Sequence, residues 1–134
     1  MTNTRINMLV IDDDDINIFI IKKVIEKTGY DVDMISKSNG QLAVDYLSSI
    51  INNAEIFPHI ILVDINMPVL NGWEFLEAYE KLNILQRKIY LYMLSSSVYE
   101  YDIEKAKSFK SVDGFISKPL TIERLRELLQ LVIP

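Results

Sequence analysis

In the stretch Met8-Leu9-Val10-Ile11-Asp12-Asp13-Asp14-Asp15, four apolar residues are followed directly by four carboxylates. Such an apolar run is typical of a buried strand, so the acids would lie together at one end of a sheet. Two carboxylates about 4 Å apart repel each other by about 4 kcal/mol at an effective dielectric constant of about 20. A bound cation would offset that repulsion, and ligands that are all oxygen favour magnesium or calcium over zinc. The same acids also suit a solvated turn that caps the next helix, so this stretch alone leaves both interpretations open.

Three further apolar runs end in polar residues. Asp64 follows the run 60–63, Ser95-Ser96-Ser97 follows the run 89–94, and Ser117-Lys118-Pro119 follows the run 112–116. The carboxyl ends of parallel strands meet at one edge of an open sheet, which is where ligands bind. We therefore expect acids, hydroxyls and an amine to converge at that edge.

The composition is that of a globular protein. The chain has 134 residues, of which 49% are hydrophobic and 25% charged, and this suits one domain with a substantial core. A net charge of -5 with no basic stripe argues against direct nucleic-acid binding. No apolar run approaches the roughly 20 residues of a membrane span, and the N-terminal residues are too polar for a signal peptide. Without cysteine there is no disulfide or thiolate chemistry, and a cytoplasmic location is expected.

Strands and helices are predicted to alternate along the chain. Gly29 is expected to end the first helix and Thr121 to cap the last one. Near-continuous apolar strands with helices between them are the pattern of a doubly wound parallel α/β sheet that is covered on both faces. The predicted strands are residues 6–11, 30–36, 60–63, 88–94 and 112–117, and the predicted helices are residues 16–28, 39–51, 72–83, 99–109 and the segment after 121.

Four motifs stand at the ends of the predicted strands. They are Asp12-Asp13, then Asp64-Ile65-Asn66-Met67-Pro68 with Gly72, then Ser95, and finally Lys118-Pro119. Together they resemble the receiver domain of bacterial two-component response regulators, and the resemblance extends from residue 8 to about residue 133. It implies a flavodoxin-like sheet of five parallel strands in the order 2-1-3-4-5 with five helices. Because the chain ends within about one turn of the last predicted helix, we expect a single receiver domain over residues 1–134 with no output domain.

The resemblance implies a role for each residue of the site. Asp64 would be the phosphoacceptor, a carboxylate nucleophile that forms an acyl phosphate. Asp13 would bind magnesium directly and Asp12 through water, and Asp64 and the main-chain carbonyl of Asn66 would complete the protein ligands. Lys118 would pair with Asp64 before transfer and with a phosphoryl oxygen after it.

Ser95 and Phe115 would form the switch of such a domain. Ser95 would hydrogen-bond the phosphoryl group and draw in the loop after its strand, and Phe115 would move inward to fill the vacated space. Many relatives have threonine in place of Ser95 and tyrosine in place of Phe115. Serine keeps the hydroxyl group, whereas phenylalanine keeps the bulk but cannot hydrogen-bond outward. Pro119 resembles the family's proline after the lysine, whose peptide bond is commonly cis.

The implied partners are a histidine kinase or histidine phosphotransfer protein and a downstream target protein. The chain would then be a phosphoacceptor signalling domain and not an enzyme. A pseudo-receiver would bind partners without phosphorylation, but every expected site residue is present. A magnesium phosphatase of the haloacid-dehalogenase type would need a second aspartate two residues after Asp64, where Asn66 stands. A flavin-binding flavodoxin would need a phosphate loop in place of the four carboxylates.

Two groups of residues lie outside these motifs. Asp14 and Asp15 are expected to cap the first helix and to interact with its dipole. His59, the only histidine, is expected to be structural or exposed to solvent.

The first helix has one apolar residue out of place. On a helical wheel, Phe19 falls among charged residues, with Ile18 at the border of an apolar arc that covers the sheet. We hypothesise that Phe19 and Ile18 contact the helical hairpin of a histidine kinase or phosphotransfer protein, with Phe19 as a binding hot spot. The predicted arc consists of Ile16, Ile20, Ile21, Val24 and Ile25.

Overall fold

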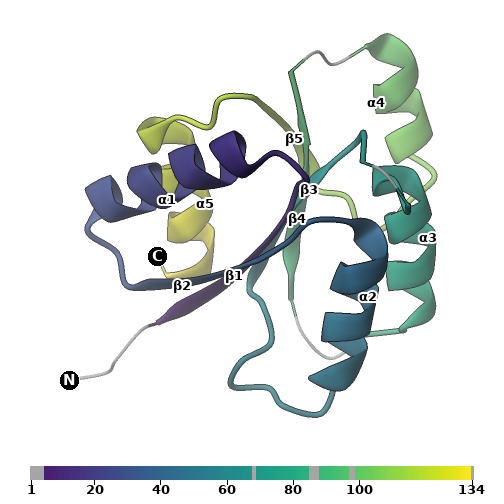
Figure 1. Cartoon of the computed structure of the whole chain (residues 1–134), viewed down its shortest axis with the longest axis horizontal. Coiled ribbons are helices and arrows are strands. Elements are labelled where there is room, and N and C mark those ends of the chain that lie inside the picture. The colour runs from purple at the N-terminus through teal and green to yellow at the C-terminus, as the bar shows by residue number, and fades with distance from the viewer. Residues whose placement is uncertain (1–4, 68, 85–87, 97–98, 134) are drawn as a thin grey trace.

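In the part of the chain that the structure describes, five parallel strands form one sheet in the order β2-β1-β3-β4-β5 (Figure 1). The structure is a computed structural model and describes residues 5–67, 69–84, 88–96 and 99–133. The strand order and the alternating helices confirm the expected flavodoxin-like fold. The strands are β1 (Ile6–Ile11), β2 (Val32–Lys37), β3 (Ile60–Asp64), β4 (Tyr90–Ser95) and β5 (Gly114–Ser117), and the helices are α1 (Asp15–Thr28), α2 (Gly40–Ser49), α3 (Gly72–Lys81), α4 (Glu100–Ala106) and α5 (Ile122–Val132).

Different helices cover the two faces of the sheet. Helices α1 and α5 pack on one face, and α2, α3 and α4 pack on the other (Figure 1). Successive side chains of a strand point to opposite faces, so Met8 and Val10 of β1 join the core under α1 and α5, whereas Leu9 and Ile11 join the other core. Both sets are buried, which explains why the central strands are apolar at nearly every position.

The register of the sheet aligns the strand ends at which the polar motifs stand. Asp64 of β3 pairs with Leu94 of β4, and Ser95 of β4 pairs with Ser117 of β5. The residues that follow these strands therefore leave the sheet at one edge, as the parallel arrangement predicts.

The helix ends follow the predicted signals. The Oδ1 atom of Asp14 accepts a hydrogen bond from the N–H of Ile16 at 2.9 Å, which makes Asp14 the N-cap of α1. The helix ends at Gly29, whose φ of 78° lies in the left-handed region that glycine adopts without strain. Thr121 caps α5, because its Oγ1 accepts the N–H of Arg124 at 3.1 Å.

The buried face of α1 differs from the predicted one. Ile16 is 71% exposed, so its predicted place in the core is wrong, and Ile18 is only 8% exposed. Asn17 and Thr28 also lie on the buried face. Both polar side chains donate a hydrogen bond, Asn17 to Asp12 and Thr28 to a carbonyl of its own helix, so each has a partner in its buried position.

Helix α4 ends at Ala106, three residues before its predicted end. The N–H groups of Lys107, Ser108 and Phe109 donate to carbonyls three residues back instead of four. The chain therefore tightens into a 3₁₀-like turn where the sequence pattern predicts a continuing helix. None of the helices in the described residues combines the length and apolar character needed to cross a membrane.

Candidate functional site

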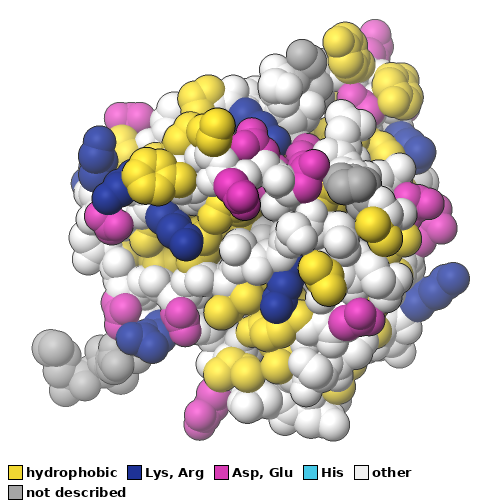
Figure 2. Space-filling view, viewed as in Figure 1, with side chains coloured by type: hydrophobic (Ala, Val, Ile, Leu, Met, Phe, Trp, Pro, Cys, Tyr) yellow, Lys and Arg dark blue, Asp and Glu magenta, His cyan; other side chains and the backbone are white. Residues whose placement is uncertain are grey.

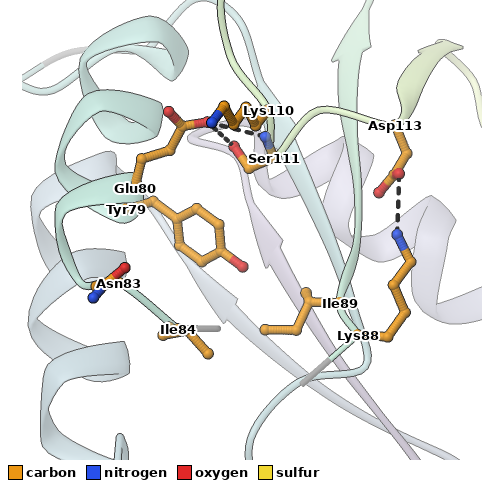
Figure 3. Close-up of a pocket in the computed structure, with 9 residues that line it drawn as sticks. All are labelled: Tyr79, Glu80, Asn83, Ile84, Lys88, Ile89, Lys110, Ser111 and Asp113. Carbon is orange, nitrogen blue, oxygen red and sulfur yellow. Dashed lines mark hydrogen bonds and ion pairs between the residues drawn. The ribbon is translucent and has the colours of Figure 1, made fainter. Parts of the chain in front are cut away.

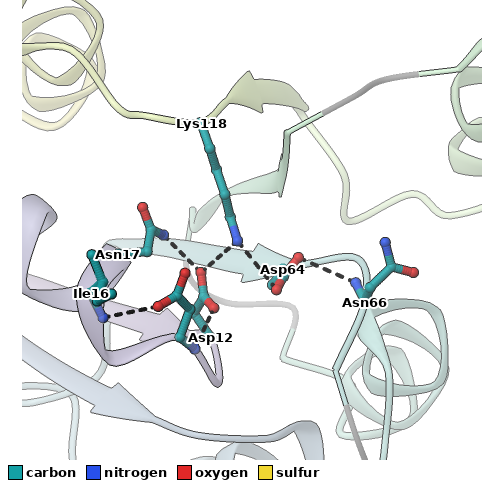
Figure 4. Close-up of polar contacts among 7 residues, drawn as sticks. Asp12, Ile16, Asn17, Asp64, Asn66 and Lys118 are labelled. Atoms are coloured by element: carbon teal, nitrogen blue, oxygen red, sulfur yellow. Dashed lines mark hydrogen bonds and ion pairs between the residues drawn. The ribbon is translucent and has the colours of Figure 1, made fainter.

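Lys118 lies between two buried carboxylates at the carboxyl edge of the sheet (Figure 4). Its Nζ atom is 3.0 Å from Oδ2 of Asp12 and 3.3 Å from Oδ2 of Asp64. The side chain of Asp12 is fully buried and that of Asp64 is 10% exposed. The three residues follow or end β1, β3 and β5, so the fold brings together groups that are far apart in the sequence.

Both oxygens of Asp12 are held in place. Its Oδ1 accepts the N–H of Asp14 at 2.9 Å, and its Oδ2 accepts the side-chain amide of Asn17 at 2.7 Å as well as the ammonium of Lys118. Asn17 reaches Asp12 from the first turn of α1 (Figure 4). The start of the helix thus fixes the orientation of this carboxylate.

Asp64 is fixed by the loop that follows β3. Its Oδ1 accepts the N–H of Asn66 at 3.2 Å. Gly72, at the start of α3, closes this loop by donating its N–H to the carbonyl of Ile65 at 2.9 Å. A Cβ atom at residue 72 would lie 2.5 Å from the main-chain oxygen of Asp64. Glycine is therefore required at this position so that α3 can approach the strand end.

The electrostatics of the site are dominated by crowded negative charge. Burial, and then the neighbouring charge of Asp12, raise the pKa of Asp64 above its usual value, although Lys118 and the N–H of Asn66 act against this shift. Burial alone would lower the pKa of Lys118, but the bonds and charges of Asp12 and Asp64 raise it. Lys118 therefore stays charged at neutral pH, and one ammonium faces more than one carboxylate.

The acids form a group that is able to hold a cation. Oxygen atoms of Asp12, Asp13 and Asp64 all lie within 4.8 Å of one another. Asp13 is exposed to solvent, whereas the other two are buried. A set of oxygen ligands that keeps an open, hydrated side matches the preferences of magnesium, which gives up its water reluctantly.

Of the two predicted switch residues, Ser95 lies at the strand end beside Lys118 and Phe115 lies farther back in β5. Ser95 ends β4 and is 6% exposed, and its carbonyl accepts the N–H of Lys118 at 2.9 Å. Phe115 is half-buried and packs against the core on the α2, α3 and α4 side, in register with Met93. The peptide bond between Lys118 and Pro119 is cis, as the resemblance implies.

The structure adds two features that the sequence reasoning missed. Asn17 was not among the predicted site residues. Lys118 pairs with Asp64 as expected, but its closer contact with Asp12 was not predicted. The signal for Asn17 was a polar side chain between Ile16 and Ile18 in the otherwise apolar stretch 16–21. A buried amide at such a position needs a polar partner, and the nearest acids in the sequence lie just before the helix.

Asp15 and His59 lie outside the motifs of the site. Asp15 lies in the first turn of α1, as predicted. His59 lies at the opposite edge of the sheet, where its Nδ1 accepts the N–H of Asn7 at 3.0 Å. Its predicted structural role is therefore confirmed.

Apolar side chains are exposed on α1 beside the acids. Phe19 is 58% exposed, as predicted, but Ile18 is buried and the part of the docking hypothesis that includes it is wrong. Ile16, at 71% exposure, is the apolar residue that accompanies Phe19 on the surface. Figure 2 shows hydrophobic and basic side chains over α1, with acidic side chains gathered where the helix begins.

The chain also resembles known proteins. It matches the model of the response regulator receiver domain over residues 8–130. A two-component response regulator from Cytophaga hutchinsonii is 34% identical, and its structure superposes with a TM-score of 0.86 over 98% of both chains. The probable methanogenesis regulatory protein FilR2 of Methanothrix harundinacea is 25% identical over 123 residues, which are 92% of this chain and 78% of that protein. The hybrid signal transduction histidine kinase F of Dictyostelium discoideum is 28% identical over 95% of this chain, but the match covers 11% of the kinase. For other curated relatives this share lies between 7% and 16%.

These similarities agree with the geometry of the site. The matched range of residues 8–130 contains the acids after β1, Asp64 at the end of β3 and Lys118 after β5. The solved relative from Cytophaga shares the fold over nearly its whole length. The chain therefore belongs to the response regulator receiver domain family.

Proposed function

We propose that this chain is a phosphoacceptor receiver that takes a phosphoryl group onto Asp64. The observation that carries the proposal is that Asp64 lies beside the ammonium of Lys118 and close to the carboxylates of Asp12 and Asp13. Phosphoryl transfer depends mainly on positioning and on neutralising charge, and these residues supply both. We further propose that residues 1–134 act as one receiver unit.

Asp64 would act as the nucleophile. One of its carboxylate oxygens forms a bond to phosphorus while the bond between phosphorus and the imidazole nitrogen of a phosphohistidine breaks. A carboxylate attacks in its deprotonated form and needs no general base, and the charge of Lys118 favours that form of Asp64. Lys118 carries an ammonium within 3.3 Å of Asp64 and is placed to pair with a phosphoryl oxygen once the carboxylate has reacted.

Magnesium is the cofactor that fits the cluster. Asp12, Asp13 and Asp64 with the main-chain carbonyl of Asn66 would hold it, and when bound it would neutralise charge on the phosphoryl oxygens. Before binding, the cluster has three carboxylates against the single ammonium of Lys118. This imbalance supports binding of a divalent cation.

Phosphorylation would act on the region around β4, α4 and β5. The hydroxyl of Ser95 would bond to the phosphoryl group and draw in the β4-α4 loop, and Phe115 would move toward the core to fill the space. The bond between the Lys118 N–H and the Ser95 carbonyl supports this coupling, because it joins the two strand ends that respond. The phosphoryl group would thereby bias an equilibrium that already exists between two arrangements.

The proposed phosphodonor is a histidine kinase or a histidine phosphotransfer protein. The match to a hybrid signal transduction histidine kinase supports this class of donor. The exposed side chains of Ile16 and Phe19 on α1, beside the acids, supply an apolar surface for a helical partner. The phosphorylated form would then bind a downstream target protein.

The alternative of a magnesium phosphatase has less support. Such an enzyme would need an acid or base two residues after Asp64, and Asn66 does not titrate. A pseudo-receiver would lack part of the charge cluster, whereas Asp12, Asp13, Asp64 and Lys118 are all present.

The experiment is phosphorylation of the whole chain with magnesium and acetyl phosphate, followed by mass spectrometry. Asp64 should carry the phosphoryl group, and Asp64→Asn should not be modified. Asp13→Asn should weaken magnesium binding more than Asp14→Asn, because Asp14 caps α1 and lies outside the cluster. A phosphoryl group on Asp12, Asp13 or a serine, or equal magnesium titrations for the two variants, would contradict the assignment.

The switch is tested separately with the beryllofluoride mimic of the phosphoryl group. Amide shifts in the NMR spectrum should concentrate in the β4-α4 loop, α4 and β5. They should collapse in Ser95→Ala, because that variant lacks the hydroxyl that couples the loop to the phosphoryl group. A full response of Ser95→Ala would show that the hydroxyl is not the coupling element.

A further inference from the structure

A cavity lies at the end of the sheet opposite the acids. It has a volume of about 380 Å³, which is within the range of small-molecule sites. Its walls come from the end of α3, from Lys88 and Ile89 just before β4, and from the turn between α4 and β5 (Figure 3). Its lining includes the apolar residues Ile84 and Ile89 and the polar residues Tyr79, Glu80, Lys88, Lys110, Ser111 and Asp113.

The floor of the cavity carries a polar group without a partner. Tyr79 is 8% exposed, and its hydroxyl points away from α3 into the cavity (Figure 3). Among the described residues this hydroxyl makes no hydrogen bond. A buried polar group usually has a partner, so a free donor aimed into a cavity indicates a place for a ligand acceptor.

The charged groups of the cavity are largely satisfied by one another. Lys88 lies 3.3 Å from Oδ1 of Asp113, whose Oδ2 accepts the N–H of Leu91. Oε2 of Glu80 accepts both the N–H and the hydroxyl of Ser111, at 2.9 Å and 2.7 Å. With Lys110 the lining has two basic and two acidic side chains, so its formal charge is zero.

These features define the chemistry of the ligand. Ile84, Ile89 and the ring of Tyr79 supply apolar contact, and the hydroxyl supplies one donor. Burial, and then the charges of Asp113 and Glu80, raise the pKa of Tyr79, so the hydroxyl keeps its proton at neutral pH. The same two acids would repel an anionic acceptor close to the hydroxyl.

We propose that this cavity is a binding site for an uncharged, single-ring molecule whose carbonyl or similar oxygen accepts a hydrogen bond from Tyr79. The ring lies against Ile84 and Ile89, and the oxygen replaces the missing partner of the hydroxyl. The site is separate from the phosphorylation site, which lies at the other end of the same strands. Binding at this cavity therefore does not depend on any role of Asp64.

The test is an NMR titration of the whole chain with benzamide as the probe. Benzoate and benzamidine have the same ring with a negative and a positive group, so they serve as matched controls for charge. Saturable amide shifts are expected at residues 79–84, 88–89 and 110–113, with a dissociation constant on the order of 1 mM for a molecule of this size. Benzoate is expected to bind at least about five-fold more weakly, because of the acids near the hydroxyl.

Two variants test the residues that carry the inference. Tyr79→Phe keeps the ring and removes only an unpartnered hydroxyl, so its unfolding midpoint should not fall, while its affinity for benzamide should drop about five-fold. Ile84→Phe should weaken binding by reducing the cavity, and Tyr101→Phe, on the exposed face of α4, should bind as the parent does.

Several results would contradict the proposed site. They are the absence of saturable shifts up to about 20 mM benzamide, shifts centred on the acids of the phosphorylation site, equal affinity of Tyr79→Phe and the parent, and benzoate binding as tightly as benzamide. Tighter binding of benzamidine than of benzamide would likewise contradict the assignment of an uncharged ligand.

Discussion

Replacing Lys118 by methionine removes the ammonium that contacts Asp12 and Asp64 and keeps a long, unbranched side chain that is one atom shorter. The Nζ atom lies 3.0 Å from Asp12 and 3.3 Å from Asp64. At an effective dielectric constant of about 20, each attraction amounts to about 5 kcal/mol. In the parent, much of this attraction is offset by the cost of taking the ammonium out of water. We therefore expect the free energy of unfolding of the variant to be lower by about 3 to 5 kcal/mol at neutral pH without magnesium.

Magnesium should reduce this loss. Without Lys118, the carboxylates of Asp12, Asp13 and Asp64 repel one another with no protein cation between them. A ligand that binds only the folded state stabilises it in proportion to the logarithm of its concentration over its dissociation constant. The variant should bind magnesium more tightly than the parent, because the ammonium no longer competes for the same oxygens. Its unfolding midpoint should therefore rise more on addition of magnesium.

The assay is urea unfolding followed by the fluorescence of Trp73, the only tryptophan, which is 6% exposed. Each protein is measured with EDTA and with magnesium chloride. Lys22→Met is the matched control, because Lys22 is an exposed lysine on α1 away from the cluster. Equal midpoints of Lys118→Met and the parent in EDTA, or equal gains on addition of magnesium, would refute the view that Lys118 neutralises these acids.

Three further predictions concern residues around the site and at the far edge of the sheet. Asn17→Ala should lower the free energy of unfolding by about 1 to 3 kcal/mol in urea melts, because Asp12 loses a buried donor; no change would mean that water replaces the amide. Phe19→Ala should slow phosphotransfer from the cognate kinase by about ten-fold or more but leave acetyl phosphate labelling and stability nearly unchanged. Equal slowing with both donors, or a fall of about 3 to 5 kcal/mol in the free energy of unfolding, would show that Phe19 is a core residue. Burial lowers the pKa of His59 below its usual value of 6.5. The folded state therefore binds fewer protons than the unfolded chain, and the free energy of unfolding should fall as the pH drops through 6.5. His59→Gln should lose this pH dependence, and an unchanged profile in melts between pH 7.5 and pH 5.5 would refute it.

The sheet and its polar edge were predictable because they depend on repeated local signals. Four apolar runs each end in a polar motif, and a parallel sheet has only one edge at which such ends can meet. The helix signals at Gly29 and Thr121 also acted as predicted, since each depends on the chemistry of one residue. The roles of Asp64, Ser95, Asn66 and Lys118 remain predictions, because they depend on a reaction and not on the fold.

The features that were missed depend on contacts between distant segments. The wheel placed Ile16 in the core because it counted only apolar residues, whereas Asn17 and Thr28 occupy the buried face with satisfied hydrogen bonds. Whether Lys118 lies closer to Asp12 or to Asp64 depends on distances of a few tenths of an ångström. No sequence pattern contains that information. The cavity at Tyr79 could not be predicted either, because its walls come from segments that are far apart in the sequence.

Helix α1 has a different role on each of its two sides. Asn17 holds the carboxylate of Asp12 from the buried side, and Phe19, two residues later, is exposed. Two residues of an α-helix differ by about 200° around its axis, so these side chains point in nearly opposite directions from the same rigid turn. A protein that binds at Phe19 and tilts or rotates this turn would move the amide that orients Asp12. Docking would then change the reactivity of the site as well as bring the phosphodonor close. The rate of transfer would depend on where and in which orientation a kinase contacts α1, and not only on its affinity.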